Sequence, residues 1–104
     1  MDNYKNPVLS AEERTEDLLS RMTLEQKIDQ LTCLVTIESE IPDFQKYVPD
    51  GIGHVGAFTT ASCVEKIAEY VYSLQKFLTQ ETELGIPALI HCEASAGAQF
   101  TEAD

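Results

Sequence analysis

Three side chains capable of chemistry stand together near the end of the sequence, in the stretch LGIPALIHCEA. His91, Cys92 and Glu93 offer a base, a thiol and a carboxylate, and His54 could join them as a metal ligand. Zinc sites, however, use four ligands at recognisable short spacings such as CxxC, and adjacent residues of a strand point to opposite faces. We therefore expect no metal site. A Cys/His catalytic pair would need a spatial partner and an orienting group, which the sequence does not single out.

The residues before these side chains predict the elements that position them. PALIH (residues 87–91) is a short apolar run, typical of a strand covered on both faces. GHVGAF (residues 53–58) predicts an earlier buried strand, although glycine weakens strands. In this reading His91 is a strand-end residue and Cys92 a small buried thiol.

A long helix is predicted between the two strands. Ser62 and Glu65 form a capping box, and Gly85 is a candidate for the residue that ends the helix. The apolar residues recur with the helical period at Val64, Ile67, Ala68, Val71, Leu74 and Leu78. Strand, helix and strand make a βαβ unit over residues 51–98, whose strands should be parallel and joined by a right-handed crossover.

The first third of the chain predicts two short helices. Residues 1–9 read as an extended lead-in, and residues 10–33 as a helical, hairpin-like segment. Ser10 with Glu13 and Thr23 with Gln26 are two further capping boxes. The second helix carries one apolar stripe at Leu24, Ile28 and Leu31.

Composition limits the classes of protein to consider. The chain has 104 residues and a formal net charge of −11, which argues against nucleic acid and anionic membranes as partners. No run of about 18 apolar residues predicts a membrane helix, and no signal peptide is visible, so we expect a cytoplasmic protein. The three cysteines are widely spaced and are expected to be reduced. GIGHVG does not open a helix as a phosphate cradle would, and we expect no cofactor.

Two stretches resemble a known family. RTEDLLSRMTLEQKIDQL (residues 14–31) is similar to the opening motif R-x-x-D-L-L-x-x-M-T-L-x-E-K-x-x-Q-L of glycoside hydrolase family 3, with Gln26 where glutamate is usual. LGIPALIHCEASAG (residues 84–97) resembles that family's L-G-I-P-x-x-x-x-x-[DE]-x-x-x-G, and DGIGHVGAF stands between the two where the family has a glycine-rich strand. The resemblance spans roughly residues 10 to 98.

The resemblance implies an α/β fold, namely the N-terminal portion of a TIM-type (β/α)8 barrel: two helices followed by one βαβ unit. It implies a retaining β-glycosidase that hydrolyses O-glycosyl bonds of β-glucosides or β-xylosides in carbohydrate metabolism. Such an enzyme uses two carboxyl groups about 5–5.5 Å apart. The family's nucleophile and acid/base lie further downstream and have no counterpart here, so residues 1–104 are a partial domain without a catalytic residue. The motif assigns Glu93 to binding the hydroxyls of the sugar.

Two other interpretations remain open. The chain could be a non-enzymatic fragment that binds sugar or another partner, and unpaired sheet edges would then favour self-association. A complete small α/β enzyme of another type would have to build its site from His54, His91, Cys92 and Glu93 alone.

Overall fold

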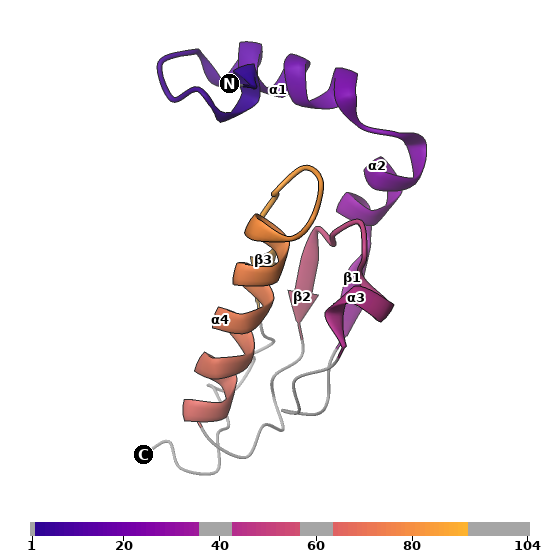
Figure 1. Ribbon diagram of the computed structural model, residues 1–104, viewed down its shortest axis with the longest axis vertical. Helices are drawn as coiled ribbons and strands as arrows, with labels where there is room; N and C mark the ends of the chain where they lie inside the picture. The colour runs from indigo at the N-terminus through magenta and orange to yellow at the C-terminus, as the bar shows by residue number, and fades with distance from the viewer. Residues whose placement is uncertain (1, 36–42, 57–63, 92–104) are drawn as a thin grey trace.

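The computed structural model describes residues 2–35, 43–56 and 64–91, and these form a mixed α/β fold (Figure 1). The elements follow in the order η1 (Asn3–Lys5), α1 (Ala11–Arg21), α2 (Leu24–Leu31), β1 (Cys33–Val35), α3 (Phe44–Tyr47), β2 (His54–Gly56), α4 (Val64–Gln80) and β3 (Leu89–Ile90). No helix among the described residues has the length and apolar character needed to cross a lipid bilayer.

The three strands form one parallel sheet in the order β1-β2-β3. The βαβ unit made by β2, α4 and β3 confirms the α/β class expected from the sequence. Leu34, Val55 and Ile90 share one row of the ladder, and Cys33, His54 and Leu89 share the row before it. Because side chains of a strand alternate between faces, these two rows face opposite sides of the sheet.

Strand β1 and helix α3 were not expected from the sequence. β1 has three residues and pairs with β2. Its first residue, Cys33, pairs with His54, which lies 21 positions later, so this strand is stabilised by tertiary pairing rather than by a local sequence pattern. Helix α3 has four residues and begins after Asp43, whose side chain accepts a hydrogen bond from the Lys46 backbone N–H. The expected strand at residues 53–58 is described only as far as Gly56.

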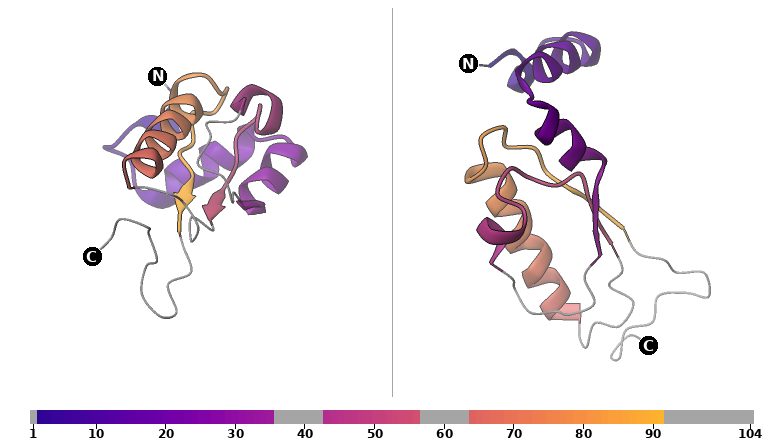
Figure 2. Two further views of the ribbon diagram at one scale, coloured as in Figure 1. Left: turned by 90° about the horizontal axis from the view of Figure 1, so that it is seen from below. Right: turned by 90° about the vertical axis from the view of Figure 1, so that its right-hand side faces the viewer.

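Helix α4 covers one face of the sheet and builds the core with it (Figure 2). Val55 of β2 and Leu74 and Leu78 of α4 are fully buried. Phe44 of α3 closes this core with its ring edge-on to Tyr70, the two ring centroids lying 5.7 Å apart. Burial of a large apolar side chain stabilises a fold by about 1.5–3 kcal/mol, so this single layer supplies much of the packing energy.

The opposite face of the sheet is uncovered among the described residues. Val35 and Leu89 are 60% and 65% exposed, and Cys33 is exposed as well. The sequence predicted strands covered on both faces, as in other parallel sheets. That expectation is wrong for the described residues, because the only helices packed into the core, α3 and α4, lie on one side of the sheet.

Gln75 on α4 holds the chain at the start of β3. Its side-chain Nε2 donates to the Ala88 carbonyl at 2.8 Å, and its Oε1 accepts from the Ala88 N–H at 3.1 Å. The N–H groups of Leu89 and His91 donate instead to Gly53 and Val55 of the neighbouring strand. One helical side chain therefore binds both backbone groups of Ala88.

The end of α4 differs from the sequence expectation. The helix ends at Gln80 rather than at Gly85. The Thr82 hydroxyl donates to the Leu78 carbonyl at 2.6 Å, so this carbonyl near the helix end is satisfied by a side chain. Gly85 instead takes a left-handed conformation, φ +64°, in the connection to β3.

The two predicted N-terminal helices and their capping boxes are confirmed. Ser10 and Thr23 each accept from the backbone N–H three residues on, and Glu13 and Gln26 accept in return from the backbone N–H of the cap. The hydrogen bond from the Ser10 backbone lowers the pKa of Glu13. The third box, Ser62 with Glu65, lies outside the described residues because Ser62 does.

The apolar stripe of α2 is exposed. Leu24, Ile28 and Leu31 are 67%, 53% and 86% exposed, while Gln26 on another face of the helix is buried. Residues 2–9, expected to be extended, include the 3-10 helix η1, which packs on α1.

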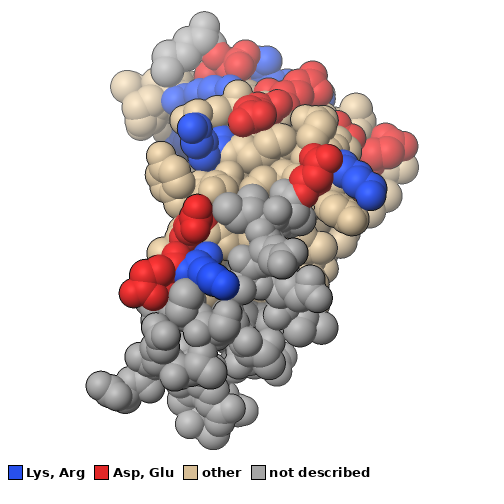
Figure 3. Space-filling view, turned by 60° about the horizontal axis from the view of Figure 1, so that its bottom comes forward, with Lys and Arg blue, Asp and Glu red and all other residues tan. Residues whose placement is uncertain are grey.

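Charged side chains do not segregate by sign on the face shown in Figure 3. Acidic and basic groups lie next to one another there, and no basic patch stands out.

Candidate functional site

The carboxyl-terminal ends of parallel strands meet at one edge of a sheet, and that edge is where α/β proteins bind ligands. Here it is formed by Val35, Gly56 and Ile90, with His91 directly after β3. The described residues at these strand ends include no aspartate or glutamate. Cys92 and Glu93 follow immediately in the sequence but lie outside the described residues.

A thiol and an imidazole meet on the uncovered face. The Cys33 Sγ lies 3.5 Å from the His91 Nε2, within hydrogen-bonding distance for sulfur. His54 presents its ring edge-on to His91, with the two ring centroids 6.2 Å apart. Residues from β1, from β2 and from the position directly after β3 therefore contribute to this group of side chains.

Gly56 leaves the space that the His91 ring occupies. A Cβ atom at position 56 would lie 2.6 Å from the His91 Cε1 and 2.8 Å from its Nε2, closer than real Cβ contacts allow. The ring thus lies over the middle strand and reaches back toward β1. Glycine at this position is a condition for the contact between Cys33 and His91.

The sequence predicted four candidate site residues, and the structure describes two of them. It adds Cys33 as a further candidate. His54 and His91 are brought together, and within residues 2–35, 43–56 and 64–91 no group of three His, Cys, Asp or Glu side chains could hold a metal ion. The sequence reasoning missed Cys33 because it missed β1. The run LTCLV, which is apolar and β-branched directly after a helix, was the available strand signal.

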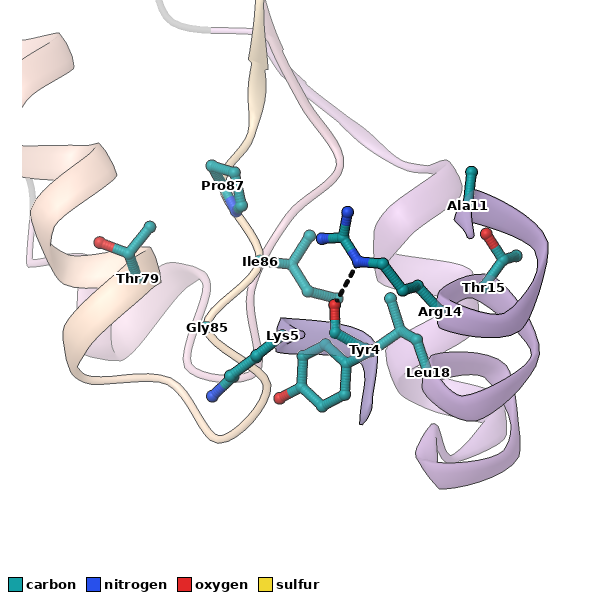
Figure 4. A pocket seen from close by; sticks show the side chains of 10 residues that line it. All are labelled: Tyr4, Lys5, Ala11, Arg14, Thr15, Leu18, Thr79, Gly85, Ile86 and Pro87. Atoms are coloured by element: carbon teal, nitrogen blue, oxygen red, sulfur yellow. Dashed lines mark hydrogen bonds between the residues drawn. The ribbon is translucent and has the colours of Figure 1, made fainter. Parts of the chain in front are cut away.

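A separate hollow of about 620 Å³ lies at the other end of the strands, between α1 and the connection from α4 to β3 (Figure 4). Leu18, Ile86 and Pro87 form apolar walls, and Lys5 and Arg14 are the basic residues among its lining. Its position at the amino-terminal ends of the strands sets it apart from the edge where parallel sheets bind substrates. We interpret it as a seam between the N-terminal helices and the βαβ unit.

A hydrogen bond crosses this seam, and others hold its N-terminal side together. The Tyr4 hydroxyl donates across the seam to the Leu84 carbonyl at 2.9 Å. On the N-terminal side, the Arg14 Nε donates to the Tyr4 carbonyl at 2.8 Å (Figure 4). The Tyr4 N–H donates to Asp17 Oδ2 at 3.0 Å, which also accepts from Arg21 Nε at 2.9 Å. The hydrogen bond from Arg21 is the main reason that the pKa of Asp17 is lowered, and Asp17 in turn raises the pKa of Arg21.

Comparison with known proteins gives one informative similarity. The chain is 37% identical over 94 residues to Beta-glucosidase C of Emericella nidulans, a match that takes in 84% of this chain. The chain spans 15% of the length of that protein. No protein-family model matches the chain. The similarity supports a distant relationship to β-glucosidases.

Proposed function

We propose that the chain is the N-terminal part of a retaining β-glycosidase of glycoside hydrolase family 3. The observation that carries this proposal is the 37% identity over 94 residues to a protein named β-glucosidase. The two motifs at residues 14–31 and 84–97, in the family's order, support the same family. The substrate class would be β-linked glucosides or xylosides.

The fold is consistent with part of a (β/α)8 barrel. In such a barrel, helices cover the outer face of a parallel sheet and the inner face is filled by side chains from other strands. Here α4 covers one face, and the other exposes Val35 and Leu89. The exposed face would correspond to the barrel interior.

Glu93 is the residue we propose for substrate binding. In the sequence it follows β3 by three positions, and barrel enzymes carry functional residues in the segments that follow their strands. A carboxylate has two acceptor oxygens and suits neighbouring sugar hydroxyls. Because the family's nucleophile and acid/base have no counterpart in these 104 residues, we propose that this chain alone is inactive.

A chimera tests the proposal without knowledge of any further sequence. The matching 84% of this chain would replace its equivalent in the Emericella nidulans protein, and hydrolysis of p-nitrophenyl β-glucoside would be measured. We expect a folded, active chimera. The Glu93→Gln substitution should then lower kcat/KM by about 10- to 150-fold, the loss expected when a charged hydrogen-bond acceptor is removed.

Glu81→Gln is the matched control. Glu81 is exposed and directly follows the last residue of α4, away from the strand ends, so its substitution should leave kcat/KM within about twofold. A folded chimera without activity would count against the family assignment. An active chimera that tolerates Glu93→Gln would count against the role of Glu93. The isolated 104-residue chain should release no p-nitrophenol above the buffer rate.

A second candidate function, a non-enzymatic interaction fragment, is favoured by the exposed side chains of the uncovered face. It differs from the first in requiring that the isolated chain bind a partner through that face. The test is whether the isolated chain associates with itself or with a partner. A charge placed on the uncovered face should weaken that association if the chain is an interaction fragment.

A further inference from the structure

The contact between Cys33 and His91 joins a nucleophile to a base on an accessible surface. Cys33 is exposed and in no disulfide, and its Sγ lies 3.5 Å from an imidazole nitrogen. The alternative acceptor for the thiol proton, the Leu34 carbonyl, is further away at 3.8 Å. The inference uses neither Glu93 nor the proposed function.

We propose that Cys33 and His91 form an activated thiol, a site for covalent modification by soft carbon electrophiles such as α-halo amides. An ordinary cysteine is only a few per cent thiolate at neutral pH, and an adjacent base activates it by taking the thiol proton. His91 Nε2 lies 3.5 Å from the sulfur, within hydrogen-bonding distance for a thiol, and in the tautomer with the proton on Nδ1 it can accept the thiol proton. The other titratable side chain on this face of the three strands is His54, whose ring approaches His91 edge-on.

The reaction with iodoacetamide can be written in full. The Cys33 S–H proton passes to His91 Nε2 as the sulfur attacks the CH2 carbon of the reagent. The S–C bond forms, the C–I bond breaks, and iodide leaves with the electron pair of that bond. The imidazolium then releases its proton to water. Carbon, sulfur and charge balance without an oxidant or a metal.

The sequence allows each cysteine to be followed separately. Trypsin cleavage after lysine places Cys33 in residues 28–46, Cys63 in residues 47–66 and Cys92 in residues 77–104. The rate of carbamidomethylation of Cys33 would be measured by mass spectrometry in the full chain, at about pH 7 and about pH 9.5, on either side of the ordinary thiol pKa. The variants are His91→Gln, which removes the base, and His54→Gln, which leaves the sulfur–nitrogen contact in place.

At pH 7 we expect Cys33 of the unaltered chain to react about 5- to 30-fold faster than in His91→Gln, the upper value being set by the few per cent of thiolate in an unassisted thiol. At about pH 9.5 the advantage should fall to about twofold or less, because an ordinary thiol ionises there by itself. His54→Gln should react like the unaltered chain. Equal rates at pH 7 would overturn the proposal. So would an advantage of the same size at both pH values, which would indicate a change in exposure rather than loss of a base.

A second variant and a denatured reference keep the test decisive if His91→Gln does not fold. Gly56→Ala retains both reacting residues but forces the His91 ring away from its place. In a folded Gly56→Ala chain, the pH 7 rate should fall to that of Cys33 in chain unfolded by guanidinium. A folded Gly56→Ala chain that keeps the fast rate would contradict the proposed geometry, as would an unaltered chain whose Cys33 reacts no faster folded than unfolded.

Discussion

Asp17 is the residue that ties the N-terminal segment together. Its carboxylate accepts from Arg21 Nε and Nη2 of the same helix and from the Tyr4 N–H of the lead-in. Arg21 Nη1 continues the network to Asp2, 3.0 Å away. This aspartate belongs to the stretch that resembles the opening motif of glycoside hydrolase family 3, and its role in this chain is structural: with Arg21, it fastens residues 2–5 to α1.

The lowered pKa of Asp17 makes this attachment dependent on pH. A carboxyl whose pKa is lower in the folded chain stabilises it above the unfolded value, about 3.9, and this contribution is lost as the pH falls through the folded pKa. In an NMR titration we expect the Asp17 carboxyl to titrate below its ordinary range. Arg21→Gln should return the midpoint toward that range, because the hydrogen bond that lowers it is gone.

Glu16→Gln provides the control for this titration, since Glu16 is exposed and next to Asp17 in the same helix. It should leave the Asp17 midpoint unchanged. An Asp17 midpoint at or above the ordinary value, or one indifferent to Arg21→Gln, would show that the pair does not form in solution.

At the scale of elements, Gln26 stands where the motif that this stretch resembles has glutamate, and its amide makes two contacts. Its Oε1 accepts from the Thr23 N–H at 3.0 Å and completes the cap of α2. Its Nε2 donates at 3.0 Å to Glu83 Oε2, in the connection after α4. A glutamate could form the first bond but has no donor for the second, so the amide joins α2 to the βαβ unit.

We therefore expect Gln26→Glu to reduce the free energy of unfolding by about 1–3 kcal/mol, because a buried side chain loses a bond to a charged partner and meets a like charge. Glu83→Gln should rescue it, since the amide introduced at position 83 can donate to the carboxylate introduced at position 26. Chemical denaturation of the two single variants and the double variant measures this coupling. Additive effects in the double variant would show that the contact carries no energy.

The sequence predicted those elements whose signals are local. The capping boxes at Ser10 and Thr23 lie within four residues of what they cap, and both helices begin where expected. The run LTCLV could indicate a strand at β1, but its pairing and the contact from Cys33 to His91 depend on register across β2, which no local pattern reports. The assignment of Glu93 to sugar binding rests on the motif alone, because Glu93 is outside the described residues.

At the scale of the whole molecule, apolar surface is left without cover in the part of the chain that the structure describes. Val35 and Leu89 are exposed on the sheet, Leu24, Ile28 and Leu31 on α2, and β1 and β3 are the edge strands of the described sheet. Exposed apolar patches and unpaired edges favour association. The net charge of −11 opposes it by mutual repulsion between copies.

We expect the isolated chain to self-associate, and more strongly at about 0.5 M than at about 0.05 M salt, because salt screens the repulsion. Leu89→Lys should weaken association by placing a charge on the uncovered face. Tyr72→Lys, which changes a residue 70% exposed on the surface of α4, is the control and should have less effect. Sedimentation equilibrium measures all three chains. A monomer at every concentration and salt would contradict the expected self-association.

The pair of hydrogen bonds between Gln75 and Ala88 has a consequence for any strand added beside β3. Backbone groups of successive residues in a strand point to alternate edges. Leu89 and His91 direct their N–H groups to β2, so those of Ala88 and Ile90 point to the outer edge. The groups of Ala88 are already taken by the side chain. An added strand would therefore form its first backbone hydrogen bonds with Ile90. This would set the register of that strand and place its pairing at the end of β3, which residues 91–93 follow in the sequence.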